Sequence, residues 1–390
     1  MESNTSNNNS KKPTTADAPV FGVNEMRLSW RQIAITTIIV IGVMAVTPSA
    51  WKHAERFETG PNYRIPYAIS ADYWLYQRRA DSLSQLVIPV VGDSVVWGEY
   101  VRKEGTLSHF LSQESGRQFA NCGVNGVFPL ALEGLVGQYG QAFSNRKVIL
   151  QCNILWLSSP KADLSIDSEE TFNHTELVTQ RFGAIPCYRA DAATRMGAFM
   201  NTHIGFYGFV NHINTVYYGQ QSLPRWTLQE SDTDPPTRPN AWRNPLSPLT
   251  FQVPGEPIDD PARGQNSRRH HAWNSRGQAP SHFEWVPLEK SLQWGATKRL
   301  IALLKSRGAD VLVILGPFNE HMIADDQMLE YRSIKGNAAS WFRSQNVALV
   351  MPDALPTELY ADASHPLTDG YQLLAREIAA DAVFKDWLKR

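Results

Sequence analysis

The sequence is short of cysteine and has almost no excess of charge of either sign. Its 390 residues include three cysteines, Cys122, Cys152 and Cys187, which are too few for a disulfide framework and show no metal-ligand spacing. Lysine and arginine number 37 against 38 aspartate and glutamate residues, so the formal net charge is −1. Binding to nucleic acid requires clustered positive charge, so we expect no nucleic-acid partner. A hydrophobic content of 43% excludes a compositionally disordered chain and is too low for a polytopic membrane protein.

Charged side chains are also missing from one stretch near the N-terminus. No charged residue occurs between Arg31 and Lys52. About 20 uncharged, mostly apolar residues suffice for one helical crossing of a bilayer. We therefore expect a transmembrane anchor at 30–51, after a disordered polar tail at 1–29. A cleaved signal peptide and a buried helix of a soluble protein are the alternatives, and the flanking positive charges hardly bias the orientation.

After a lead-in segment at 52–83, short apolar runs alternate with amphipathic segments. The runs expected to be strands are 86–91, 119–122, 148–155, 310–315 and 347–351. The segments expected to be helices are 97–115, 127–143, 287–307, 325–345 and 367–388. Strands that alternate with helices predict an α/β domain over 84–390, with a parallel sheet covered on both faces.

The stretch 157–286 interrupts this alternation. Nine prolines fall between Pro224 and Pro261, which excludes a regular helix or a central strand there. We expect a long insertion with some helix near 190–218. Its tryptophans either stack on sugar rings or form a small core of the insertion. His203 and His212 are not spaced as an i,i+4 metal-binding pair, and we expect structural roles for both.

Three polar motifs lie where predicted strands end. Gly92-Asp93-Ser94 follows the first strand, 121–126 with Gly123 follows the second, and Asn153 lies near the end of the third. Ligands of open α/β sheets bind beyond the carboxyl ends of the strands. A serine at such a turn can act as a nucleophile, whereas backbone N–H groups and an asparagine amide can stabilise an oxyanion. Taken singly, each motif is equally compatible with an ordinary turn.

A fourth motif, Asp362-Ala363-Ser364-His365, precedes the last predicted helix. Acyl transfer by a serine needs a base that takes the hydroxyl proton and a carboxylate that orients this base. The spacing lets Asp362 reach Nδ1 of His365, which leaves Nε2 for Ser94. We therefore predict a catalytic triad of Ser94, His365 and Asp362, with an oxyanion hole formed by Ser94, Gly123 and Asn153.

Two further polar residues follow the strand expected at 310–315. Asn319 and His321 should lie at the same edge of the sheet as Ser94. There they either contact substrate or stabilise the loop, as a helix cap does.

The four motifs resemble the sequence blocks of the SGNH (GDSL-type) hydrolase family. Ser94, Gly123, Asn153 and His365 match the four residues after which the family is named, and Asp362 matches its carboxylate. The resemblance covers 84–155 and 287–390. The third block departs from the usual Gly-x-Asn-Asp, because it reads Gln151-Cys152-Asn153-Ile154.

This resemblance implies a flavodoxin-like, three-layer α/β/α fold and ester chemistry through an acyl-serine, without metal or cofactor. The implied activity is that of a serine esterase or O-acyltransferase for small acyl groups, acetyl first among them. Membrane-anchored members with large insertions include enzymes of exported polysaccharides, which favours a cell-envelope glycan as substrate and an extracytoplasmic catalytic domain. The alternatives are a non-catalytic glycan-binding or scaffold protein and a membrane-associated lipase.

Overall fold

The computed structural model describes residues 28–57, 59–163, 174–178, 185, 188, 190–228, 243–255 and 271–390. The predicted tail at 1–29 falls almost wholly outside these residues, as do parts of the insertion predicted at 157–286. The chain divides into two compact units, Met1–Thr47 and Pro48–Arg390.

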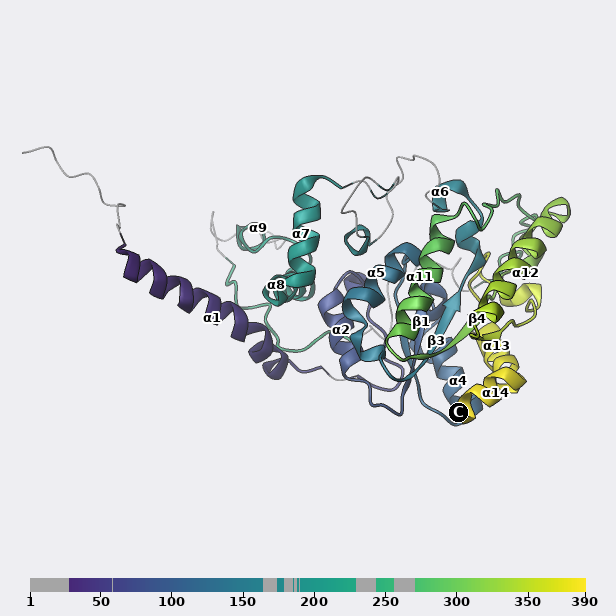
Figure 1. Ribbon diagram of the computed structural model, residues 1–390, viewed down its shortest axis with the longest axis horizontal. Coiled ribbons are helices and arrows are strands. Elements are labelled where there is room, and N and C mark those ends of the chain that lie inside the picture. Colours follow the sequence, from purple (N-terminus) through teal and green to yellow (C-terminus); the bar gives the residue numbers. More distant parts are fainter. Residues whose placement is uncertain are drawn as a thin grey trace, which may run out of the picture. The chain divides into compact units, whose positions relative to one another are not determined.

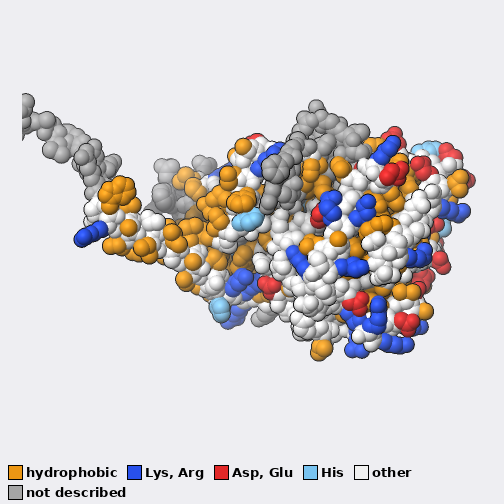
Figure 2. All heavy atoms as spheres, in the orientation of Figure 1, with side chains coloured by type: hydrophobic (Ala, Val, Ile, Leu, Met, Phe, Trp, Pro, Cys, Tyr) orange, Lys and Arg blue, Asp and Glu red, His pale blue; other side chains and the backbone are white. Residues whose placement is uncertain are grey.

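The first unit contains most of helix α1, Trp30–Ala54. The helix has 25 residues, none of them buried, and hydrophobic side chains cover it (Figure 2). A helix of about 20 apolar residues spans a hydrocarbon core of about 30 Å. Helix α1 is therefore long and apolar enough to cross a membrane.

The second unit is built on a five-stranded sheet in the order β2-β1-β3-β4-β5, in which all neighbours are parallel (Figure 1). The strands are β1 (Ile88–Gly92), β2 (Phe119–Gly123), β3 (Lys147–Cys152), β4 (Asp310–Leu315) and β5 (Ala348–Val350). All five predicted strands are present, with shifted ends. Because parallel sheets carry helices on both faces, these strands are almost continuously apolar.

Helices cover both faces of the sheet, so the predicted three-layer α/β/α class is confirmed. One core contains side chains of α2 (Tyr73–Asp81), α5 (Pro129–Tyr139), α11 (Leu292–Ser306) and α12 (Met328–Ser344). The other contains side chains of α3 (Ser94–Trp97), α4 (Leu107–Ser115), α13 (Thr368–Ala380) and α14 (Ala382–Lys389). Successive strand residues alternate between the cores, as in Leu312 and Val313 of β4.

Two of the predicted helices are broken in the structure. The segment 97–115 contains the end of α3 and all of α4, because Gly98 ends α3 with a left-handed φ of +85°. The segment 367–388 contains α13 and most of α14, because the carboxylate of Asp381 accepts hydrogen bonds from Val383 N–H and Phe384 N–H and starts a new helix.

The lead-in at 52–83 and the predicted insertion at 157–286 also contain helices. Helix α2, within the lead-in at 52–83, buries Leu75 and Tyr76 in the core. Further helices are α6 (Pro160–Asp163), α7 (Ala192–His203), α8 (Gly205–Tyr217) and α9 (Leu223–Leu228). Short 3-10 helices lie at Tyr67–Ile69, Lys103–Gly105, Gln141–Phe143, Ile154–Leu157, Thr175–Leu177, Glu320–Met322, Asp325–Gln327 and Thr357–Leu359. Trp273 and Trp285 are buried in the cores beside the sheet, so neither presents a free face to a sugar ring.

Candidate active site

Ser94 lies at the carboxyl edge of the sheet, as the first residue of α3 directly after β1. The turn is tight, because a Cβ atom on Gly92 would lie 2.5 Å from Cγ2 of Val96. Asp93 caps the helix, and its Oδ1 accepts a hydrogen bond from Val95 N–H at 2.8 Å. Glycine and an aspartate cap in succession therefore hold the Ser94 hydroxyl at the point where the strand ends.

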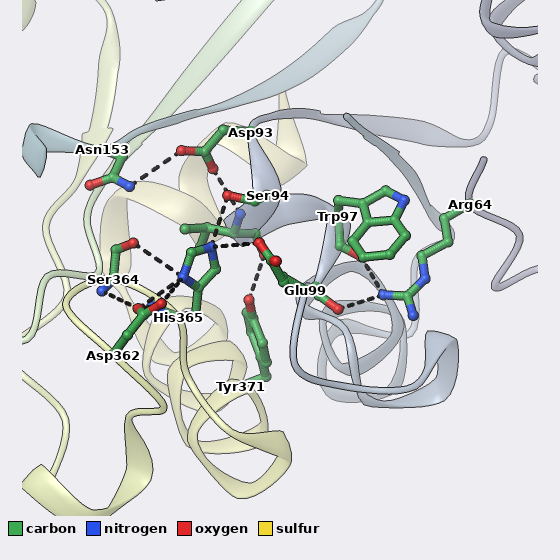
Figure 3. A network of polar contacts seen from close by, with 12 residues as sticks. Arg64, Asp93, Ser94, Trp97, Glu99, Asn153, Asp362, Ser364, His365 and Tyr371 are labelled. Atoms are coloured by element: carbon green, nitrogen blue, oxygen red, sulfur yellow. Dashed lines mark hydrogen bonds and ion pairs between the residues drawn. The ribbon is translucent and has the colours of Figure 1, made fainter. Parts of the chain in front are cut away.

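His365 and Asp362 reach Ser94 from the other end of the chain (Figure 3). Nε2 of His365 is 2.8 Å from Oγ of Ser94, although 271 positions separate the two residues. Nδ1 of His365 is 2.8 Å from both carboxylate oxygens of Asp362. With its Nδ1 proton donated to Asp362, the neutral imidazole presents Nε2 to the serine as an acceptor. The structure thus brings together a hydroxyl, an imidazole and a carboxylate in the order that acyl transfer by a serine requires.

The loop before α13 holds this arrangement in place. Oδ1 of Asp362 accepts hydrogen bonds from the backbone N–H groups of Ser364 and His365, each at 2.9 Å. The Asn319 amide donates to the carbonyl oxygen of Asp362 at 3.1 Å, and Asn319 N–H donates to that of Ala363 at 2.8 Å. The orientation of Asp362 is therefore set before any substrate binds.

The charges of the site shift the pKa values of Asp362 and His365. Burial raises the pKa of Asp362, but the charge of His365 and the hydrogen bonds that the carboxylate accepts outweigh this effect and lower that pKa to about 2. Burial lowers the pKa of His365, but Asp362, Glu99 and Asp93 together raise it to about 9. Three carboxylates thus favour the imidazolium form of His365.

Asn153 lies beyond the end of β3, beside the start of α3. Its side chain is buried, and its Nδ2 donates to Oδ2 of Asp93 at 3.2 Å while its Oδ1 accepts from Leu155 N–H at 2.9 Å. These bonds fix the orientation of the amide. Since an amide nitrogen carries two protons, one remains for a further acceptor.

The structure does not offer Gly123 as a free oxyanion donor. Its N–H donates to Oδ1 of Asn121 at 3.0 Å, and a Cβ atom there would lie 2.4 Å from the backbone nitrogen of Trp97. The glycine is needed for close packing of β2 against α3. Three residues later, Gly126 has a left-handed φ of +76°, and its N–H has no acceptor among the residues that the structure describes. Gly126 belongs to the same 121–126 motif, and the sequence by itself does not show which N–H groups of this motif are bonded.

Asn319 and His321 differ in burial, because Asn319 is buried and His321 is exposed. Asn319 is fully buried and serves the Asp362 loop, whereas Nε2 of His321 lies 3.0 Å from the carbonyl oxygen of Leu355. Of the two interpretations, substrate contact and loop stabilisation, these hydrogen bonds favour loop stabilisation for Asn319 and for His321.

Three residues near the site, Glu99, Tyr100 and Arg64, belong to none of the four sequence motifs and could not be predicted from them. Oε2 of Glu99 lies 3.9 Å from Nε2 of His365, and the ring of Tyr100 meets the imidazole edge to face with centroids 5.2 Å apart. Arg64 is buried, and its guanidinium donates to the carbonyl oxygens of Trp97 (2.5 Å), Gly98 (2.7 Å) and Val101 (2.8 Å). Arg64 thereby holds the segment that carries Glu99 (Figure 3).

Metal-ligating side chains are not clustered in the part of the chain that the structure describes: no group of three or more His, Cys, Asp or Glu residues is arranged to hold a metal ion there. The arrangement of Ser94, His365 and Asp362 is suited to nucleophilic acyl transfer.

Comparisons with protein-family models and with curated proteins find no match for this chain. Among solved structures, a similar chain is a protein assigned to the G-D-S-L family of lipolytic proteins from Desulfitobacterium hafniense DCB-2. The identity is 11%, the alignment covers 75% of this chain and 98% of that chain, and the TM-score is 0.34. At this level of similarity, function has to be argued from the geometry of the site.

Proposed function

We propose that this protein is a serine esterase or O-acyltransferase of the SGNH type, which acts on small acyl esters through an acyl-serine. The observation that carries the proposal is the chain of contacts from Ser94 Oγ to His365 Nε2 and from His365 Nδ1 to Asp362, all at 2.8 Å. Nucleophile, base and orienting carboxylate in this order are the parts that acyl transfer requires.

Each step follows from the positions of these atoms. Ser94 Oγ attacks the acyl carbonyl carbon, and its proton passes to Nε2 of His365. The tetrahedral intermediate collapses, the bond to the alcohol breaks, and the leaving oxygen takes the proton from Nε2. Water or a sugar hydroxyl then gives its proton to Nε2 and attacks the acyl-serine, which releases a carboxylic acid or a new ester and restores the Ser94 hydroxyl.

The oxyanion of the tetrahedral intermediate needs donors held in place beforehand. We assign this role to Ser94 N–H and to the free amide proton of Asn153. Gly123 N–H is already bonded to Asn121 Oδ1 and is not assigned to the oxyanion. A backbone N–H at the end of a strand is suited to this task because it cannot reorient.

The test uses the full chain in detergent micelles with p-nitrophenyl acetate. We expect release of nitrophenol and, after rapid acid quenching, a peptide in which Ser94 carries an acetyl group. Adding an oligosaccharide distinguishes the two activities, because an acyltransferase acetylates it whereas an esterase releases only acetate. Absence of both nitrophenol release and acetylated Ser94 would contradict the proposal.

Replacing Asn153 by alanine should lower kcat by about 10²–10³, the usual effect of removing one oxyanion donor. Circular dichroism and the melting temperature check that the variant folds. Wild-type kcat in a folded Asn153→Ala protein would remove Asn153 from the proposed oxyanion hole.

The pH dependence of kcat/KM should reveal the charge of Glu99. Only neutral His365 can accept the serine proton, so activity should rise with pH toward the pKa of about 9. Removing the carboxylate that lies 3.9 Å from Nε2 lowers this pKa, and Glu99→Gln should shift the midpoint to lower pH by about one unit. Glu104→Gln, an exposed change on the same segment, is the control and should keep the wild-type midpoint. Equal midpoints in all three proteins would contradict this role of Glu99.

The location of the substrate is a further part of the proposal. We infer that α1 anchors the protein in a membrane, that the catalytic unit is extracytoplasmic, and that its acyl esters belong to a cell-envelope polysaccharide. The support is the length and apolar surface of α1 together with the family resemblance of the motifs. Protease added to intact spheroplasts should digest the catalytic unit; a unit that is cut only after lysis would contradict the orientation.

A further inference from the structure

A cavity lies at the opposite edge of the sheet from Ser94. Its volume is about 610 Å³, and it is lined in part by Val87, which precedes β1, and by Phe119 and Ala120 at the start of β2. Volumes of this size are typical of small-molecule sites. Strand β1 separates the two edges by about 17 Å, since each of its five residues advances about 3.3 Å. The cavity is therefore distinct from the proposed active site.

Arg79 is the charged side chain of this cavity. It lies in the last turn of α2 and is only 6% exposed. Among the residues that the structure describes, its guanidinium forms no ion pair, and its buried Nε has no hydrogen-bond partner. Its Cζ atom lies over the ring of Tyr63, 5.4 Å from the ring centroid. A buried charge is costly unless it is paired, so this position calls for an anion.

The neighbouring arginine shows that the fold can satisfy such a group. Arg78, one position earlier in α2, forms an ion pair with Glu55 and donates to two backbone carbonyl oxygens. Arg79 is turned toward the cavity and has no such partner among the described residues. No aspartate or glutamate occurs among the described residues that line this cavity. Its positive charge is thus left for a ligand.

The rest of the cavity wall carries amides, hydroxyls and one imidazole. Gln113 and Gln118 are exposed there, and no hydrogen bond involves their side chains within the described part of the chain. Nδ1 of His109 lies 3.0 Å from Oδ1 of Asn62, so Nδ1 carries the proton and Nε2 of the neutral ring is left as an acceptor. Burial lowers the pKa of His109, which favours this neutral form. Amide groups and a neutral imidazole can donate to and accept from sugar hydroxyls.

We propose that this cavity binds an acidic sugar, with the carboxylate or phosphate of the ligand against Arg79 and its hydroxyls against Gln113, Gln118 and His109. A uronic acid and a sugar phosphate share this chemistry, namely one anionic group next to several hydroxyls. The site does not depend on the acyl-transfer activity proposed for Ser94, and its test requires no turnover.

The experiment is titration calorimetry of the full chain in detergent micelles. The probes are glucuronate, glucose 6-phosphate, glucose and inorganic phosphate. Arg79→Gln removes the buried charge, and Gln113→Glu places a carboxylate at the exposed rim without disturbing the core. Arg117→Gln is the matched control, because it removes a positive charge from the exposed segment between α4 and β2.

We expect saturable binding of glucuronate, glucose 6-phosphate or both, and weaker binding of glucose and of inorganic phosphate. Affinity should fall about tenfold or more in Arg79→Gln and fall also in Gln113→Glu, but stay unchanged in Arg117→Gln. A preference for one acidic probe identifies the carboxylate or the phosphate as the source. The proposal is overturned if no acidic probe binds, if inorganic phosphate binds as tightly as glucose 6-phosphate, or if folded Gln113→Glu binds like the wild type.

Discussion

Replacing Ser94 by alanine should lower kcat for p-nitrophenyl acetate by about 10⁴–10⁶-fold, because no other hydroxyl lies against Nε2 of His365 in the described part of the chain. His365→Ala should lose about as much, since residues that act as one unit are not additive in their effects. The measurement is initial nitrophenol release by the full chain in detergent, with the burst of acyl-enzyme recorded in the same experiment.

The control for this change is Ser340→Ala, which removes an exposed hydroxyl from α12. It should retain wild-type kcat, and both serine variants should keep the wild-type melting temperature because neither change opens a cavity in the core. If Ser94→Ala retains wild-type kcat, the acyl-serine mechanism is wrong for this protein.

A comparably large effect, on stability, is expected at His212. This side chain is fully buried on α8, where Nδ1 is 2.6 Å from Oδ2 of Asp72 and Nε2 is 3.0 Å from Oε1 of Glu55. Tyr217 also donates to Glu55, at 2.6 Å. Replacing His212 by glutamine removes the positive charge between two buried carboxylates. We expect a loss of about 3–5 kcal/mol in the free energy of unfolding, measured by chemical denaturation.

The contacts of His212 with Asp72 and Glu55 also predict how the free energy of unfolding changes with pH. Burial lowers the pKa of His212, but Asp72 and Glu55 outweigh it and raise that pKa to about 9, above the ordinary value of 6.5. A raised pKa in the folded state stabilises the protein below pH 6.5, and this contribution is lost as the pH rises toward 9. Because His365 contributes in the same direction, the test is the difference between the wild type and His212→Gln, which should shrink over this range.

His203→Gln is the matched control for the change at His212. His203 ends α7, is exposed, and stacks on Phe199 with ring centroids 4.2 Å apart. Its loss should change the free energy of unfolding by less than about 0.5 kcal/mol, as is usual for surface positions. If the His212→Gln protein is as stable as this control, the contacts of His212 with Asp72 and Glu55 make no net contribution to the free energy of unfolding.

Much of the fold could be predicted from the sequence because its signals are local. Each strand of the parallel sheet is a short apolar run between polar residues, so β1 to β5 were expected within a few residues of their ends. The positions of Ser94 and His365 were predicted for a related reason: in a parallel sheet, the motifs that follow strands meet at one edge. The sequence does not predict the breaks at Gly98 and Asp381, because a helix can continue past either residue type when packing favours it.

The rest depended on contacts between residues that are distant in the sequence. Motif spacing could not show that Gly123 N–H is bonded to Asn121 Oδ1, because that bond depends on how β2 packs against α3. Likewise, only folding places Glu99 beside His365, and Arg79 at a cavity whose described lining residues include no carboxylate.

The sequence by itself determined the order of strands and helices along the chain, the apolar character of α1, and the residue types available at the carboxyl edge of the sheet. Their local patterns suffice because hydrophobic periodicity and turn chemistry act over a few residues. Only the tertiary structure decided which N–H groups are already bonded, which carboxylates surround His365 and His212, and which arginine has no ion-pair partner among the described residues. These outcomes depend on burial and on distances between side chains up to 271 positions apart, and electrostatic interactions change steeply with both.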